Sequence, residues 1–188
     1  MVELATPHVR FHRSYLEAVD EFLAMGEERH AGLLSLPPDD AFEGIRFTRA
    51  SLEDPAEFRR LVDYYVNDAL PDSPRPAGWV PCTRRWLARG DEYLGTVNLR
   101  HSLDHPLLRD EGGHIGYAVR PRARRQGHAR DALRQMVRLA GSMGIPRVLV
   151  TCDLDNIASA RTIEAGGGVY EGDLNGKRRY WIDTPHAR

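Results

Sequence analysis

Residues 112–140 read GGHIGYAVRPRARRQGHARDALRQMVRLA, and this stretch decides the fold class. An apolar run ends near Val119, and Pro121 closes it because proline cannot donate a hydrogen bond to a strand ladder. A basic loop and Gly127 follow. Apolar residues then recur at the spacing of one buried helix face: Ala129, Leu133, Met136, Val137 and Ala140. The pattern predicts a strand, a loop and a helix in direct succession.

The loop in this stretch has the features of an anion site. A helix N-terminus presents unpaired N–H groups and a positive dipole end, and arginine can bind phosphate oxygens in pairs. Gly127 lets the backbone approach a ligand closely. Residues 120–130 contain no acid and five arginines: Arg120, Arg122, Arg124, Arg125 and Arg130. This indicates a diphosphate site at the start of a helix; the alternative is a solvated basic turn before an ordinary helix.

Patterns on both sides extend this unit into a mixed sheet. Helical spacing predicts helices over 13–30, with Ser14 as a cap, and over 53–68. Residues 86–88 and 93–99 form a predicted hairpin, and 169–173 and 178–182 another around Asn175-Gly176. A strand at 114–119, a helix at 127–143, a strand at 147–152 and a helix at 156–165 lie between them. The strand–helix–strand unit should form a right-handed parallel crossover.

Composition narrows the class of protein. The 188 residues suit one domain, and the net charge of −1 favours neither nucleic acid nor membrane as a partner. Two cysteines, Cys82 and Cys152, cannot build a structural zinc site alone, so we expect no metal. Residues 1–13 lack an apolar signal segment and no stretch is long enough to span a bilayer. We therefore expect a reduced, cytoplasmic chain.

Three blocks of the sequence resemble the GNAT superfamily of acetyltransferases. Arg124-x-x-Gly127-x-Ala129 is similar to the family's pyrophosphate loop, which has Arg or Gln, two variable residues, Gly, one variable residue and then Gly or Ala. Residues 115–121 (IGYAVRP) resemble its fourth strand, and 149–159 (LVTCDLDNIAS) its fifth strand with the Asn-x-x-Ser entry to the next helix. The resemblance is strong over 112–170 and extends over about 44–184. The blocks GGHIGY, CDxDNIAS and RRYWI also resemble a less characterised branch.

The resemblance implies an α/β (α+β) fold of the GNAT type. Its mixed, mostly antiparallel sheet would carry helices on both faces and would split between the fourth and fifth strands to hold acetyl-CoA. Residues 1–43 would be a helical extension packed on the same domain, and 44–188 the acetyltransferase domain. The resemblance implies that pantetheine pairs with the backbone near Ala118, Val119 and Arg120. The pyrophosphate would lie in the loop Arg124, Arg125, Gln126, Gly127, His128 and Ala129, on the amides of residues 125–129, and Asn156 and Ser159 would contact the pantetheine arm. Locally, Asn156 and Ser159 can equally be helix-capping residues.

The implied reaction is direct attack by a primary amine, of a small molecule or a peptide, on the thioester. A backbone N–H near Val119 would polarise the carbonyl. His114 is the first candidate base because imidazole titrates near neutrality, followed by Glu111 and His101; each can instead make an ordinary surface hydrogen bond. Many family members have a tyrosine acid seven residues after the asparagine, where this chain has Ile163. Tyr117, Tyr170 and Tyr180 are alternatives, or packing aromatics.

Two other function classes compete with this interpretation. The missing tyrosine is compatible with a non-catalytic acyl-CoA-binding or sensor domain. The arginine run is compatible with nucleic-acid binding, although the net charge and the lack of aromatic stacking residues nearby argue against it. We expect residues 13–42, 71–81 and 101–113 to shape the acceptor pocket, with no recognisable substrate signature. A homodimer is compatible with the resemblance.

Overall fold

The central sheet is mixed and largely antiparallel. The computed structural model describes residues 2–185. Seven strands lie in the order β1-β4-β5-β6-β7-β9-β8, and β2 pairs with β3 in a separate sheet. The strands are β1 Glu3–Ala5, β2 Leu34–Leu36, β3 Ile45–Phe47, β4 Cys82–Arg89, β5 Glu92–Arg100, β6 Ile115–Val119, β7 Arg147–Asp153, β8 Val169–Leu174 and β9 Lys177–Asp183. The expected fold class is confirmed.

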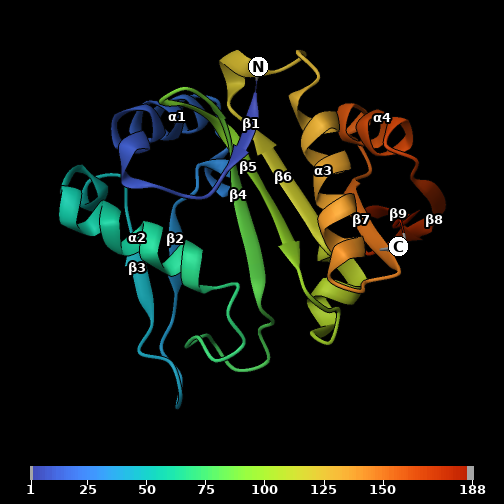
Figure 1. Cartoon of the computed structure of the whole chain (residues 1–188), viewed down its shortest axis with the longest axis horizontal. Helices are drawn as coiled ribbons and strands as arrows, with labels where there is room; N and C mark the ends of the chain where they lie inside the picture. Colours follow the sequence, from blue (N-terminus) through green and yellow to red (C-terminus); the bar gives the residue numbers. More distant parts are fainter. Residues whose placement is uncertain (1, 186–188) are drawn as a thin grey trace.

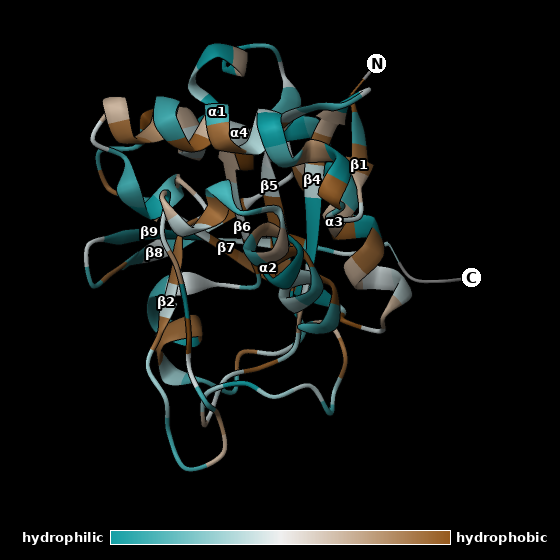
Figure 2. Ribbon diagram, turned by 90° about the vertical axis from the view of Figure 1, so that its left-hand side faces the viewer, coloured by the Kyte–Doolittle hydropathy of each residue, from teal (hydrophilic) through white to brown (hydrophobic). Residues whose placement is uncertain are grey.

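Helices cover both faces of this sheet (Figure 1). On one face lie α1 (His12–Ala24) and α2 (Pro55–Asn67), and on the other α3 (His128–Ser142) and α4 (Ile157–Ala165). α2 begins as its sequence predicts, because Pro55 occupies the first turn and Asp54 Oδ1 accepts a hydrogen bond from Ala56 N at 2.8 Å. The helices carry both hydrophobic and hydrophilic residues (Figure 2), as helices with one buried face do.

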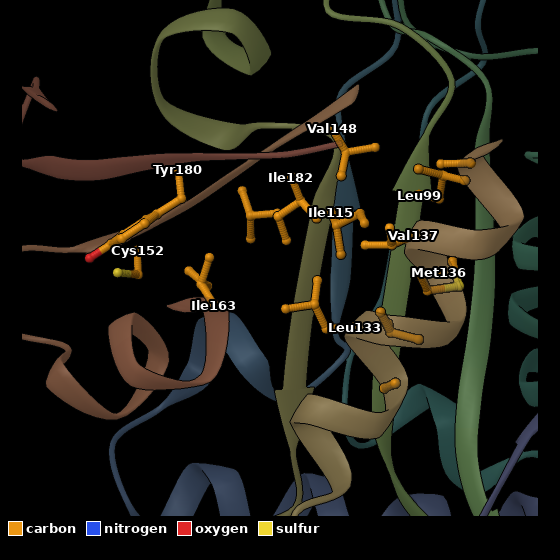
Figure 3. Packing of buried hydrophobic residues seen from close by; sticks show 14 of the residues in the cluster. Leu99, Ile115, Leu133, Met136, Val137, Val148, Cys152, Ile163, Tyr180 and Ile182 are labelled. Carbon is orange, nitrogen blue, oxygen red and sulfur yellow. The ribbon is translucent and has the colours of Figure 1, made fainter. Parts of the chain in front are cut away.

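Two hydrophobic cores result, one on each face. On the α3 side, Leu133, Met136 and Val137 face Leu99 and Ile115 of the sheet (Figure 3). The same core continues under α4, with Ile163, Cys152 and Tyr180. On the opposite face the fully buried Trp86 lies among aromatic residues of α1, α2 and the turn before α1: Phe11, Tyr15, Phe58 and Tyr65. The two cores fix the helices on either side of β6.

The sheet opens between β6 and β7. These are its parallel neighbours, and they share a single register pair, Ile115↔Val150. Beyond it β7 continues its antiparallel pairing with β9, and β6 continues with β5. The strands therefore diverge from Gly116 onward, as the predicted split requires.

The structure corrects several expected elements near the N-terminus. The first helix ends at Ala24 instead of continuing to residue 30, because Gly26 takes a left-handed conformation (φ 70°) and Glu27 N bonds back to Phe22 O. Ser14 lies inside this helix, and its hydroxyl accepts hydrogen bonds from Tyr93 N and Arg120 Nη1 instead of capping. The short strands β1, β2 and β3 were not predicted, and β4 begins at Cys82, four residues before the expected strand.

The N-terminal segment is part of this architecture. β1 pairs with β4 at the edge of the sheet, and α1 packs against β5. Within residues 2–185, no helix has the length and apolar character needed to cross a membrane.

Candidate functional site

A cavity of about 700 Å³ lies where β6 and β7 diverge. β6, the loop after it, the start of α3, α4 and the segment after α1 form its walls. Nine of the eleven cofactor residues expected from sequence line it: Ala118, Val119, Arg124, Arg125, Gly127, His128, Ala129, Asn156 and Ser159. Gln126 lines a smaller neighbouring cavity, together with Gly127, Arg130 and Arg161.

The loop before α3 is shaped to expose backbone N–H groups. Arg125 and Gly127 both have left-handed backbones, with φ values of 61° and 82°. Gly127 is the N-cap position of α3, and no side chain among residues 2–185 caps this 15-residue helix. Free N–H groups and the positive dipole end therefore face the cavity, and this arrangement suits an anion. The residues thus fit a diphosphate.

The charges around the cavity favour the same ligand. Four arginines line it, Arg124, Arg125, Arg130 and Arg161, against one carboxylate, Glu27. Arg124 is neutralised, since both its terminal nitrogens pair with the Glu27 carboxylate, one of them at 2.8 Å. Arg125 and Arg161 form no ion pair with any residue in the range 2–185. The surplus positive charge can therefore meet phosphate groups.

The strand β6 offers backbone groups to the gap. Arg120 N donates to Leu94 O of β5 at 2.8 Å, and backbone groups alternate between the two sides of a strand. Tyr117 and Val119 therefore direct their N–H groups toward the open side, where pairing with β7 has ended. Unpaired backbone groups need partners, and the amides of a pantetheine arm are suitable ones. Ala118 directs its backbone to β5, its side chain packs against the core on the α1 and α2 face, and the residue also lines the cavity.

Arg120 does not line the cavity, and its backbone, expected to pair with pantetheine, has protein partners: its N–H donates to Leu94 O and its carbonyl accepts from Ala123 N. Its side chain is completely buried on the α1 side and donates from Nε to Glu21 Oε1 at 2.9 Å and from Nη2 to Glu17 Oε2 at 3.1 Å. Arg122 also pairs with these acids and with Glu92. Two of the five arginines in the run therefore fasten the loop to α1.

Tyr117 reaches across the cavity to α4. Its hydroxyl lies 2.8 Å from Ser159 Oγ, and burial raises the pKa of Tyr117 to about 12, so the phenol stays protonated. Asn156 caps α4, because its Oδ1 accepts from Ser159 N at 3.0 Å, and it also lines the cavity. Ile163, at the position of the family's tyrosine, is wholly buried in the core. The tyrosine in this cavity therefore comes from β6.

His114 has a structural environment. The side chain is 7% exposed, and its Nδ1 accepts a hydrogen bond from Leu149 N at 2.9 Å. In the neutral ring that acceptor leaves the proton on Nε2, so no free lone pair remains to take a proton from an amine. Burial, and then the charge of Arg100, lower the pKa of His114 to about 4. This geometry disfavours His114 as the base, and it joins β6 to β7 at the closed end of the split.

The other two candidate bases also lie outside the cavity lining. Glu111 lies in a short π-helical turn (Leu108–Gly112), and its Oε1 accepts from Asn175 Nδ2 at 3.4 Å. His101 Nε2 lies 2.8 Å from Thr83 Oγ1, and burial lowers its pKa. The structure thus separates all three candidates from the residues around the gap.

Several residues of the cavity were not predicted. Glu27 and His30 reach it because α1 ends early and the following 3₁₀ turn (Glu28–His30) returns toward the loop before α3. His30 is exposed on one side, and partial desolvation of its ring lowers the pKa of His30, which favours the neutral ring. Arg161 and Thr162 follow Asn156 on α4, so the helical spacing after that residue could have indicated them.

Comparison with known proteins now gives the family. The model of the acetyltransferase (GNAT) domain matches residues 28–169, most of the chain. The chain belongs to the GNAT acetyltransferase family. It is therefore an acyltransferase. A comparison with curated protein sequences found no match.

Solved structures of this family share the fold. The microcin C7 self-immunity acetyltransferase MccE, in complex with acetyl-CoA and AMP, is 13% identical with a TM-score of 0.62, over 97% of this chain and 92% of that one. RimL, a ribosomal L7/L12 alpha-N-protein acetyltransferase in complex with coenzyme A, is 17% identical with a TM-score of 0.60, over 97% and 94%. Mycobacterium smegmatis RimJ, in complex with CoA-disulfide, is 14% identical with a TM-score of 0.64, over 97% and 81%.

Proposed function

We propose that this GNAT enzyme transfers an acetyl group from acetyl-CoA to the primary amine of a small molecule or peptide. The cavity at the diverging strands supports this best, because it joins an uncapped helix start, surplus arginine charge and the open side of β6. Three solved relatives are described in complex with acetyl-CoA, coenzyme A or CoA-disulfide, and the solved relatives include an alpha-N-protein acetyltransferase and a spermidine acetyltransferase.

Two parts of the cavity would bind two different parts of acetyl-CoA. The diphosphate would lie on the N–H groups at residues 125–129, with Arg125, Arg130 and Arg161 around it. The pantetheine arm would extend along Tyr117 and Val119, where the β6 backbone has no strand partner on the β7 side. When bound, the co-substrate supplies an activated thioester carbonyl. The backbone N–H groups of Tyr117 and Val119 are then the donors available to polarise its oxygen.

The transfer needs one proton removed and one delivered. The amine nitrogen forms a bond to the acetyl carbon, the carbon–sulfur bond breaks, and the proton lost by the amine balances the proton gained by sulfur. We propose that the Tyr117 hydroxyl delivers the latter, since it is protonated at neutral pH and lines the cavity. His30 is a better candidate than His114 to accept the proton lost by the amine, because the neutral His30 lines the cavity and His114 does not.

Tyr117→Phe tests the assigned acid. It keeps the ring packing and removes the hydroxyl, so we expect kcat to fall about tenfold or more with acetyl-CoA affinity nearly unchanged. The matched control is Tyr170→Phe, whose hydroxyl bonds to Asp173 on the exposed edge strand β8 and should have no effect on kcat. Equal rates in the parent and Tyr117→Phe would show that the thiolate leaves without this group.

A screen of amines tests the function as a whole. Release of coenzyme A from acetyl-CoA is measured across amino acids, short peptides, polyamines and aminated small molecules. Amine-dependent release with an N-acetylated product would support the proposal. Binding of acetyl-CoA, seen as a raised melting temperature, with no release for any amine would favour the non-catalytic acyl-CoA sensor instead.

A further inference from the structure

Three central strands present a partly exposed row of polar positions on the α1 and α2 face of the sheet. The row runs across the sheet through neighbouring register partners: Arg84 of β4 lies opposite Asn98 of β5, and Asn98 lies opposite Gly116 of β6. All three are partly exposed, whereas the next positions along β5, Val97 and Leu99, are fully buried. Solvent therefore reaches the middle of the sheet here, and we call Arg84, Asn98, Arg100 and Gly116 the polar floor.

Gly116 keeps this floor open. Its backbone does not have a positive φ, so the conformation does not require glycine. A Cβ at this position would lie 3.6 Å from Asn98 Nδ2 and 3.8 Å from both terminal nitrogens of Arg100, and these are the nearest atoms. The space above Gly116 is thus bounded by hydrogen-bond donors, and any side chain would begin to fill it.

Arg84 carries a charge with few partners in the protein. Its guanidinium lies 4.1 Å from the centre of the Tyr65 ring, and Nη1 donates to Asn98 Oδ1 at 3.2 Å. Nε is buried with no hydrogen-bond partner, and no carboxylate within residues 2–185 forms an ion pair with Arg84. A partly buried guanidinium with no ion-pair partner can bind an anion without first losing a protein partner, so a ligand anion at this place would be stabilised.

Positive charge outweighs negative charge around Arg84. The charged groups near it are two further cations, Arg75 and Arg100, and one carboxylate, Asp68, which acts on Arg84 without forming an ion pair with it. Asp68 lies 3.8 Å from Arg75 Nε, and Arg100 Nη1 is used by the carbonyls of Gly112 and Gly113. Three cations against one acid leave a local surplus of positive charge.

Building on the proposed function, we propose that the acceptor amine carries a carboxylate and that Arg84, with Asn98 beside it, binds that carboxylate. The floor adjoins the reaction site, since Gly116 directly precedes the three β6 residues that line the cofactor cavity. The Arg84 guanidinium reaches over β5, and neighbouring strands lie about 4.8 Å apart. The carboxylate would therefore bind about one strand away from the gap, a span that suits amino acids and very short peptides.

Matched pairs of acceptors test this assignment. The kcat/KM for acetylation is measured for amino acids, dipeptides and tripeptides, each with a free carboxylate and as its C-terminal amide. We expect the parent enzyme to prefer at least one free acid over its amide by tenfold or more. Arg84→Gln should reduce that preference to within about threefold by raising KM for the acid, and should leave acetyl-CoA affinity unchanged. Ethanolamine and its phosphate ester form a further pair of acceptors. If the enzyme prefers the phosphate ester but prefers no free acid over its amide, the polar floor binds phosphate and the carboxylate assignment is wrong.

The control is Arg85→Gln, the same change of charge on the next residue of β4. Its side chain lies on the other face, where its register partner Val97 packs under α3, so the preference should remain. Arg84→Lys should keep part of the preference, because it retains charge without the guanidinium fork. Acetylation of amines with equal rates for acids and amides would overturn the inference while leaving the proposed function standing. No acetylation of any amine would instead count against the proposed function.

Discussion

The segment 114–130 divides into a first half, residues 114–122, and a second half, residues 124–130. The two halves have opposite roles, although both carry basic residues. In the first half, His114, Arg120 and Arg122 are engaged by other parts of the fold: the β7 backbone, α1 and the β4–β5 hairpin. In the second half, Arg125, Gly127 and the start of α3 face the cavity, and their charges and N–H groups have few protein partners. The same residue types thus serve folding in one half and ligand binding in the other, and what separates them is whether the fold already supplies a counter-charge.

The largest effect should come from Arg120. In Arg120→Met the two carboxylates of α1, the Ser14 hydroxyl and the Tyr93 carbonyl lose a buried partner, and removing one member of such a network costs about 3 kcal/mol. Arg122→Met is the control, since Arg122 pairs with the same acids but its side chain is 51% exposed, and exposed pairs contribute about 1 kcal/mol or less. Denaturant unfolding measures both. Loss of acetyl-CoA affinity in Arg120→Met with unchanged stability would return this residue to the binding site.

His114 should affect stability through pH. The folded pKa near 4 lies below the usual 6.5, so the unfolded chain binds a proton that the folded chain does not between these values. The stabilisation is complete above pH 6.5 and is lost as pH falls toward 4, with a total of about 3 kcal/mol at 1.36 kcal/mol for each pH unit.

His114→Asn removes this titration and retains an acceptor near the position of Nδ1. We expect its unfolding free energy to fall less steeply between pH 6.5 and 4 than that of the parent, and kcat at pH 7 to change less than for His30→Gln. Parallel stability curves for the parent and His114→Asn, with a tenfold loss of kcat in the variant, would restore His114 as the base.

The second half could be predicted from sequence because its features are local. Arg124-x-x-Gly127-x-Ala129 places glycine, arginines and a helix start within six residues, and the structure brings nine of the eleven expected cofactor residues to one cavity. The position of the Arg120 side chain could not be predicted in this way, because its counter-charges, Glu17 and Glu21, lie about one hundred residues earlier in the chain. The motif predicts the loop well because all its residues lie close together in the sequence. It does not show which of its arginines pair with residues far away in the chain.

The polar floor and the segment after α1 could not be predicted from local sequence patterns. Arg84, Asn98 and Gly116 come from three strands and meet only through the register of the sheet. Glu27 reaches the cavity because Gly26 ends α1, whereas apolar spacing alone suggested a longer helix. The strands β1, β2 and β3 have three residues each, too few for an alternating pattern to be recognised.

A side chain at Gly127 should lower both the affinity for acetyl-CoA and the stability of the fold. Gly127→Glu places a carboxylate beside the N–H groups at the start of α3 and should lower acetyl-CoA affinity at least tenfold, or about 1.4 kcal/mol. Its φ of 82° also makes any side chain strained by about 1–2 kcal/mol. Gly144→Glu is the matched control, because Gly144 has φ 81° just beyond the C-terminal end of α3, with open space around it. Calorimetric titration with acetyl-CoA should separate the two variants, and equal affinities would place the diphosphate elsewhere.

The smallest expected effect concerns Glu27, the acid that faces the arginines of the second half. Its ion pair with Arg124 holds the pKa of Glu27 below its usual range, so it is charged at neutral pH and opposes a bound diphosphate. Glu27→Gln should therefore raise acetyl-CoA affinity about threefold, or about 0.6 kcal/mol, which is within the range of up to about 1 kcal/mol typical of exposed pairs. Arg124→Ala should lower it by no more than a similar factor, since the charge removed is already neutralised.

Glu28→Gln is the control for this last change, because Glu28 is an exposed neighbour with the same charge and lies outside the cavity lining. Added salt should shrink the difference between Glu27→Gln and the parent, since screening weakens the repulsion between the carboxylate and the phosphates. If Glu27→Gln instead bound acetyl-CoA more weakly, the ion pair would be positioning Arg124 for the ligand. Arg124 would then belong with Arg120 among the arginines whose protein partner determines their role, and the boundary between the two halves would move past residue 124.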